Sequence, residues 1–368
     1  MIMKRNAGKI LSAAKASAVL ILFLLCIFYP QLTGKAVSEA LQRCLVTVIP
    51  SLYAMMIVSA VIVRSGILTY TPKAMERLSG AVFGMDGFTM AVFSFSAFSG
   101  YPVGTSMIIE RYEKKAISRE TASVLSGLCC GAGPAFVFGC ISGKYYSTPA
   151  AGIIITLSAV SANLLLALML SPFLKKSKSA QYTEKKGLSL TSETLTESII
   201  SSGKSMAVIC FTITAFAVLS EFLDASGIYG KAGGILSRLS GLPEKNAVSL
   251  LRGITDITAA GPLPRDDYTL LPFLCAMTSF GGICVLFQLC TLIRERFPVM
   301  PLILIRTASA ILSGVICRVT VPFFLRRQLI AVSVINVRLY SPPSPVPSVM
   351  LIIMTFMLFL SFKRERRK

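Results

Sequence analysis

Two glycine-containing breaks in an otherwise apolar sequence carry residue types that could hold a polar solute. The first is the motif Ser99-Gly100-Tyr101-Pro102-Val103-Gly104, and the second runs from Arg252 through Asp256 to Gly261. Glycine disfavours helix propagation and proline lacks an amide proton, so each break frees backbone carbonyls and amides. At membrane depth these groups need partners from protein, water or a ligand. We therefore expect a cavity where the two breaks meet.

The candidate substrate-binding residues lie at these breaks and at a later turn. They are Ser99, Gly100, Tyr101, Pro102, Gly104, Arg252, Asp256, Gly261, Ser279 and Gly281. The first break has two interpretations: a polar backbone lining with the Tyr101 hydroxyl as a handle, or a tight turn packed against its counterpart. Arg252 and Asp256 are four positions apart on one helical face, so they could pair with each other. Such a pair could bind a solute or relay a proton, or it could merely neutralise its own charges.

Nucleophilic and metal chemistry finds little support. The chain has ten cysteines, nearly all inside apolar runs, with no CxxC pair, and it has no histidine. Cysteines in such surroundings act as small hydrophobic residues, and histidine is the commonest general base and metal ligand. We therefore do not expect the protein to be an enzyme, and we expect it to have no catalytic residue, cofactor or metal site. The sequence also lacks GxxxxGK[ST], so any pumping would be driven by an ion gradient or a partner.

Composition indicates one integral membrane domain. Of the 368 residues 54% are hydrophobic, and the mean hydropathy is +0.71. The formal charge of +20 comes from Lys and Arg clustered in loops and at both ends, as in a protein held against an anionic inner leaflet. Nucleic-acid binding is not indicated, because basic residues are not interleaved with aromatics on a soluble surface.

Eight apolar runs approach the roughly 20 residues that cross a bilayer. They are 10–28, 45–63, 122–141, 150–172, 206–223, 270–293, 299–325 and 346–362. Two further runs, 81–109 and 247–264, contain the breaks, and we interpret both as re-entrant. This choice keeps the lysine-rich loop after Pro172 and both termini in the cytoplasm, as the positive-inside rule favours. It leaves Arg326, Arg327 and Arg338 outside, in mild conflict with that rule.

The two breaks also suggest an internal repeat. Sliding the second half back by 157 residues places 250–261 on 93–104, and both windows end in glycine. A unit of helix, re-entrant segment, helix and helix crosses three times, so its copy runs inverted, as in many secondary transporters. The alternative is chance similarity between apolar sequences. The expected fold is all-α, with about eight transmembrane helices, two re-entrant segments and inverted structural repeats.

The segment 98–139, FSGYPVG through GPAFVFG, resembles the YlbJ-type sporulation integral membrane proteins, which carry a nucleoside-recognition Gate domain. GITDITAAG (253–261) and SFGGICVLFQ (279–288) resemble matching motifs of that family, and the likeness covers about 50–325. It implies a cell-membrane protein of endospore formers that is needed for spore cortex formation. Family members often carry Glu at the position of Asp256, and more polar residues where this chain has Cys129-Cys130-Gly131.

The resemblance and the spans together divide the chain into five parts. These are an N-terminal transmembrane helix and loop (1–44), a first Gate-like repeat (45–172), a flexible cytoplasmic linker (173–203), a second, inverted repeat (204–325), and an external Pro-rich loop, last helix and basic cytoplasmic tail (326–368).

Two functions remain open. The first is transport or sensing of a small polar solute, nucleoside-like by analogy only, by rocking of one repeat against the other. The second is a structural membrane protein that recruits other sporulation membrane proteins to the forespore envelope. Among isolated polar residues, we expect Asn163 and Gln288 to make interhelical hydrogen bonds, and Arg306 and Arg318 to snorkel towards opposite interfaces.

Overall fold

The computed structural model is helical with no strand in the residues that it describes, which are 16–17, 20–67, 72–146, 148–176, 190–260, 263–264 and 267–331. Residues 20–28 of the expected first helix are helical. The expected last helix (346–362), the Pro-rich loop, the side chains of Arg326, Arg327 and Arg338, and Gly261 lie outside this description.

Five helical stretches within the described residues are long and apolar enough to cross a membrane. They are 30–64, 150–169, 192–225, 268–293 and 300–324. A sixth candidate joins 75–82 to 87–99 and is bent by 89°. The lengths and composition fit a multi-pass membrane protein. The described residues thus contain five or six candidate spans, and they do not confirm the expected number of eight.

One long helical stretch covers residues 30–64. It comprises α2 (Pro30–Arg43), a π-helical segment η1 (Cys44–Val48) and α3 (Ile49–Arg64). Pro50 cannot donate a backbone hydrogen bond to the preceding turn, and the wider π-helical turn lies just before it. This helix begins well before the predicted start at residue 45. A short amphipathic helix, α4 (Lys73–Val82), follows.

The next segments alternate short helices with breaks. In order they are α5 (Gly87–Ser99), α6 (Val103–Glu113), α7 (Arg119–Leu128), α8 (Pro134–Phe136), η3 (Val137–Ser142), α9 (Gly143–Tyr145), α10 (Ala150–Met169) and α11 (Ser171–Lys176). The predicted single helix at 122–141 is wrong, because α7 ends at Leu128 and the helix resumes at Pro134. The intervening glycines disfavour helix, and Pro134 lacks the amide that would continue it.

The flexible linker expected over 173–203 is shorter than predicted. Helix α12 (Ser192–Ala225) already begins inside it, and α11 covers 173–176. Thr191 caps α12 by accepting a hydrogen bond from the Thr194 amide at 3.2 Å, and Glu193 lies in the positive first turn. Residues 192–203 are polar because they form the first turns of a long helix, and not because they form a loop.

After α12 the chain again alternates helices and breaks. The elements are α13 (Ile228–Ser240), α14 (Glu244–Thr255), η4 (Ile257–Ala259), η5 (Tyr268–Leu270), α15 (Leu271–Phe280), α16 (Gly282–Ile293) and α17 (Met300–Ala331). The predicted uninterrupted run at 270–293 is broken at Gly281 and Gly282. Both residues have positive φ, 90° and 80°, a conformation that favours glycine.

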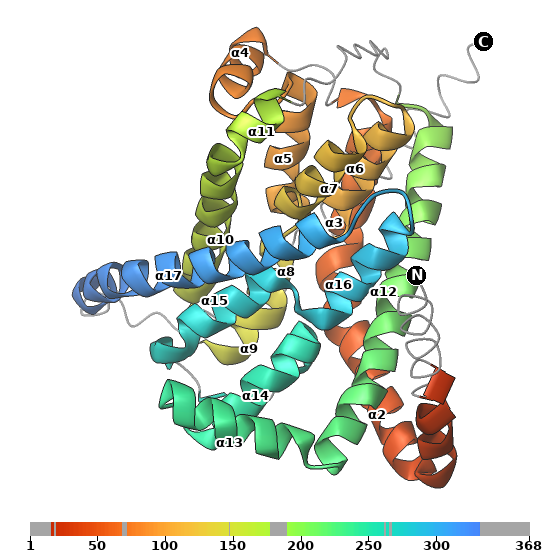
Figure 1. Cartoon of the computed structure of the whole chain (residues 1–368), viewed down its shortest axis with the longest axis vertical. Coiled ribbons are helices and arrows are strands. Elements are labelled where there is room, and N and C mark those ends of the chain that lie inside the picture. The colour runs from red at the N-terminus through yellow and green to blue at the C-terminus, as the bar shows by residue number, and fades with distance from the viewer. Residues whose placement is uncertain are drawn as a thin grey trace, which may run out of the picture.

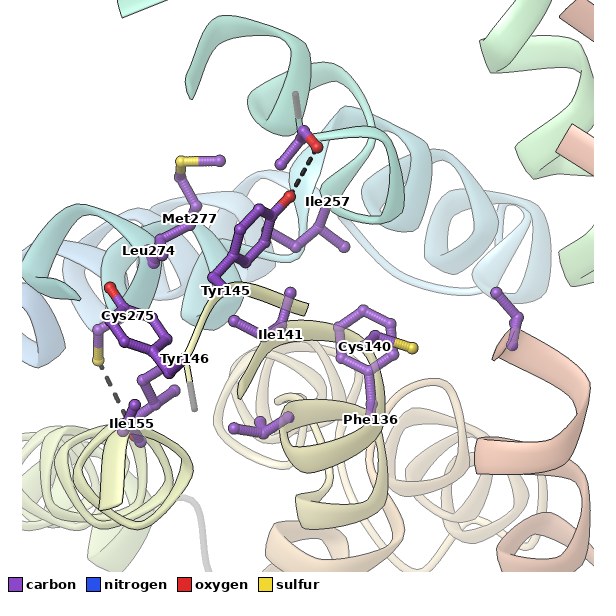
Figure 2. Close-up of a cluster of buried hydrophobic side chains, with 14 of the residues drawn as sticks. Phe136, Cys140, Ile141, Tyr145, Tyr146, Ile155, Ile257, Leu274, Cys275 and Met277 are labelled. Carbon is purple, nitrogen blue, oxygen red and sulfur yellow. Dashed lines mark hydrogen bonds between the residues drawn. The ribbon is translucent and has the colours of Figure 1, made fainter. Parts of the chain in front are cut away.

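Helix α17 crosses the middle of the molecule and packs against α15, α10 and α7 (Figure 1). Helices α4 and α11 lie at one end, with α13 at the other (Figure 1). Figure 2 shows a buried cluster in which Phe136, Cys140 and Ile141 lie near Ile257 and Leu274. The segment after the α7–α8 break therefore packs against the segment after α14.

Candidate functional site

Helices α5 and α6 form a closed helical hairpin around the first break. Asp86 caps α5 by accepting a hydrogen bond from the Thr89 amide at 2.6 Å. The other oxygen of Asp86 lies 2.6 Å from Arg111, which is in the last turn of α6. The start of α5 and the end of α6 therefore lie together, and the chain turns back at residues 100–102.

The hairpin tip is packed tightly on the break between α7 and α8. The Tyr101 amide donates to the Gly131 carbonyl at 2.7 Å. Gly100 has φ 75°, and a Cβ there would lie 2.7 Å from the Gly133 nitrogen. A Cβ on Gly104 would collide with the Cys129 carbonyl oxygen. Glycine at both positions is thus explained by close backbone contact with the 129–133 connection of the same half, and not by packing against the second break.

The second break does not contain the expected ion pair between Arg252 and Asp256. Helix α14 ends at Thr255, so Asp256 is extended, with φ −144° and ψ 114°, and leaves the face that carries Arg252. Arg252 instead pairs with Asp224 at 2.6 Å. The Asp256 carboxylate accepts hydrogen bonds from the Thr258 amide at 3.0 Å and the Thr258 hydroxyl at 2.8 Å.

Tyr101 and Asp256 meet at a small buried cavity between the two breaks. The cavity has a volume of about 20 Å³ and is also lined by Cys284 and Gln288 of α16. We call it the inner cavity. Asp256 is 1% exposed, and the buried Tyr101 hydroxyl has no hydrogen-bond partner among the described residues. The structure thus brings together one predicted residue from each break.

A second, much larger cavity is also lined by residues of the hairpin tip. It has a volume of about 750 Å³ between α3, α6 and α12, and we call it the vestibule. Pro102 and Val103 line it, whereas Tyr101 lines the inner cavity. Its polar lining is formed by Arg64, Ser106, Glu110, Arg111, Lys114, Thr194, Glu197, Ser201, Ser202 and Ser205.

Sequence reasoning missed the vestibule. Ser201, Ser202 and Ser205 follow one another at spacings that place them on one face of α12. That spacing was visible in the sequence, but most of these residues lay in the segment interpreted as linker. Arg64 of α3 and Glu197 of α12 form an ion pair with side chains 39% and 53% exposed. This pair joins the two helices beside the vestibule.

Of the remaining predicted site residues, Ser99, Ser279 and Gly281 are described by the structure and Gly261 is not. Ser99 is buried at the end of α5, and its hydroxyl has no partner among the described residues. Gly281 lies at the α15–α16 break, where a Cβ would be 3.7 Å from the Tyr101 ring. Ser279 is buried just before this break. Gly261 is not described.

Two cations approach the carbonyls that follow Asp256. Arg43 donates to the Thr258 carbonyl at 3.4 Å, and Lys144 donates to the Ala260 carbonyl at 3.0 Å. The Tyr145 hydroxyl donates to the same Ala260 carbonyl at 2.6 Å, which Figure 2 shows as a dashed line. The second break is therefore held by side chains of α2 and α9. Within the described part of the chain, no group of three or more His, Cys, Asp or Glu could hold a metal ion.

The isolated polar residues behave differently from one another. The Asn163 side-chain oxygen accepts hydrogen bonds from Ser309 at 2.7 Å and Arg306 at 3.3 Å, which confirms the predicted interhelical role. Gln288 donates instead to Cys284 within its own helix at 3.6 Å. The expectation that Arg306 snorkels is wrong, since the residue is only 1% exposed.

Comparison with known proteins gives one informative match. No family model matches the chain. The chain is 23% identical over 322 residues to the sporulation integral membrane protein YlbJ of Bacillus subtilis (strain 168), a match that covers 79% of this chain and 78% of the relative. The chain is therefore similar to a YlbJ-type sporulation integral membrane protein. No solved structure matches the chain.

Proposed function

We propose that the chain transports or senses a small polar solute, which enters the vestibule and reaches the inner cavity past the hairpin tip. The observation that carries this proposal is the position of two neighbouring residues. Pro102 lines the large polar vestibule, and Tyr101 lines the inner cavity with Asp256. The tip of α5–α6 is thus the partition between the two spaces. Movement of this tip would connect them.

The lining of the vestibule suits a polar solute, because it offers hydroxyls and charges of both signs. The inner cavity is lined mainly by apolar side chains, with Tyr101 and Asp256 as its polar members. Buried polar atoms without partners are costly, so they favour a guest that supplies the missing hydrogen bonds. The inner cavity is too small for such a solute as it stands, so occupancy requires the tip to move.

The order of elements supports inverted structural repeats as the basis of that movement. Helices α5 and α14 begin at Gly87 and Glu244, and 244 − 87 = 157, the shift found in the sequence. In each half a break follows, and a later ten-residue helix, α7 or α15, ends at a glycine-containing break; α6 has no counterpart between α14 and α15. In this proposal the two copies are the repeats 45–172 and 204–325, and rocking of one against the other alternates access.

The membrane orientation follows from charge. The lysine-rich segment after Pro172 would lie in the cytoplasm, together with both termini. Glu113 at the end of α6 pairs with Arg296 of the α16–α17 connection at 2.7 Å, so these two connections lie together. We place them and the vestibule mouth on the cytoplasmic side of the cell membrane.

The biological setting comes from the relative. YlbJ is described as a sporulation integral membrane protein, and we extend a role in sporulation to this chain. Within that role, spore cortex formation is what the family resemblance implies. The Gate domain and nucleoside recognition remain an analogy. A rival role is structural, in which the protein recruits other sporulation membrane proteins without transport. The tight contacts of Gly100 and Gly104 favour this rival, because they describe a packed tip.

Filling the vestibule separates the two roles. Ser205 of α12 lines the vestibule, and Val208 on the same helix is 47% exposed outside it. We expect Ser205→Phe to lower the yield of heat-resistant spores and Val208→Phe to leave it unchanged, with equal protein abundance in the membrane. A protein that only recruits partners would tolerate both substitutions. Neither of them removes the outer surface on which a partner would bind. Normal spore yield with Ser205→Phe would contradict the solute proposal.

A further inference from the structure

Arg306 carries a buried positive charge that no carboxylate of the described residues neutralises. It lies in the apolar part of α17 and is 1% exposed. One terminal nitrogen donates to the carbonyls of Gly127 and Cys130 and, at 3.3 Å, to the side-chain oxygen of Asn163. None of the ion pairs among the described residues includes it. Carbonyl dipoles at the end of α7 offset part of this charge, but isolated charges at membrane depth are normally paired.

A cavity of about 30 Å³ lies beside this side chain, lined by parts of α5, α7, α10 and α17. Arg306 and Thr156 both line it. Arg306 Nε and the Thr156 hydroxyl are buried with no hydrogen-bond partner among the described residues. Asn163 lines it as well, and its oxygen is already used by Arg306 and Ser309, which leaves its NH₂ group available. Arg306 Nε and the Asn163 NH₂ group can only donate, and the Thr156 hydroxyl can donate as well as accept, so three donors lie beside a positive charge.

We propose that this cavity binds one monovalent anion of the size of chloride. Hydrogen-bond donors beside a cation repel metal ions and favour an anion. The volume is enough for a monatomic ion or about one or two water molecules, which excludes a multi-atom anion such as sulfate. Water alone would satisfy the donors but would leave the charge of Arg306 without a counterion.

The site is separate from the inner cavity and supports the hairpin tip. Cys130 and Gly131 line the anion cavity, and the Gly131 carbonyl accepts the hydrogen bond from the Tyr101 amide. A bound anion would hold the 129–133 connection against Arg306. It would thereby fix the surface on which the tip of α5–α6 rests.

Halide-dependent stability tests the site. The melting temperature of the purified full chain would be measured at increasing concentrations of sodium chloride, sodium bromide or sodium gluconate, with the ionic strength held equal. We expect a saturable rise in melting temperature with chloride and bromide and none with gluconate. Arg306 variants could simply misfold, so Thr156→Val is the informative change. It removes one donor while keeping the charge and should weaken halide affinity about tenfold.

Thr291→Val is the matched control, because Thr291 bonds the Phe287 carbonyl of its own helix at 2.9 Å, away from the cavity. Its halide response should equal that of the unmodified protein. The anion site is wrong if chloride and gluconate give the same melting temperature throughout, or if Thr156→Val and Thr291→Val respond to halide alike.

Discussion

Tyr101 and Asp256 belong to different breaks of the chain, yet they line the same buried cavity. Tyr101 reaches it from the tip of the α5–α6 hairpin, and Asp256 reaches it because α14 ends one residue earlier. The position of Tyr101 depends on close packing of the tip against the α7–α8 break. Changes to that packing should therefore affect the whole protein, whereas changes to the two side chains should affect function first.

Substitution of Gly104 should show how tightly the tip is held. Gly104→Ala places a methyl group against the Cys129 carbonyl, which can move only with its backbone. We expect the free energy of unfolding to fall by roughly 1–3 kcal/mol, as for other overpacked sites. Denaturant titration of the purified protein measures it. Gly34→Ala is the control, because nothing lies within 4 Å of its Cβ and the helix should gain roughly 0.5–1 kcal/mol. Equal effects at both positions would show that the tip does not press on the Cys129 carbonyl.

Asp86 should contribute to hairpin closure in two separable ways. Asp86→Asn keeps a side-chain oxygen for the Thr89 amide but removes the charge that faces Arg111, whose side chain is only 9% exposed. We expect a loss of about 1 kcal/mol, and about 1 kcal/mol more for Asp86→Ala, which also removes the cap. The exposed pair of Lys35 and Glu39 is the control: Glu39→Gln should change the free energy of unfolding by less than about 0.5 kcal/mol. A cost for Asp86→Asn no greater than that for Glu39→Gln would argue against the closed hairpin.

A double-mutant cycle should assign the partner of Arg252. The pair with Asp224 is partly exposed, at 32% and 37%, so we expect a coupling energy on the order of 0.5 kcal/mol between Arg252→Gln and Asp224→Asn. The cycle of Arg252→Gln with Asp256→Asn should give a coupling energy near zero. Stronger coupling to Asp256 than to Asp224 would restore the pairing that the sequence suggested.

Local residue chemistry predicted the breaks but not their partners. Ser118 immediately precedes α7, and its hydroxyl accepts a hydrogen bond from the Thr121 amide at 3.2 Å, a cap that residue type alone favours. The spacing of Arg252 and Asp256 fits one helical face, but that inference assumes a helix that continues past Thr255. A cap depends on neighbouring residues alone, whereas an ion pair depends on where a helix ends and what packs beside it.

The burial of Arg306 and the existence of the vestibule could not be predicted from the sequence, because both depend on contacts between distant segments. The apolar residues around Arg306 gave no sign that the α7 carbonyls and Asn163 would receive its guanidinium, because those groups are far away along the chain. The vestibule likewise exists only when α12 lies across α3 and α6. Its serine face was readable, but a polar composition at the start of α12 looked the same as a linker.

Passage of solute between the vestibule and the inner cavity can be tested with a double substitution that removes polar groups but keeps side-chain size. Tyr101→Phe with Asp256→Asn removes the hydroxyl and the charge from the inner cavity while keeping the ring and the oxygen that accepts from Thr258. Tyr112→Phe with Asp267→Asn is the matched control. Asp267 accepts from the Thr269 amide in the same arrangement, and both residues lie outside the inner cavity and the vestibule.

The measurement is the yield of heat-resistant spores from cells that depend on this chain, with the abundance of each variant determined in the membrane. We expect the spore yield to fall at least about tenfold for the first pair at normal abundance, and not to fall for the control. Full spore yield from the Tyr101 and Asp256 double variant at normal abundance would contradict it and favour the recruiting role.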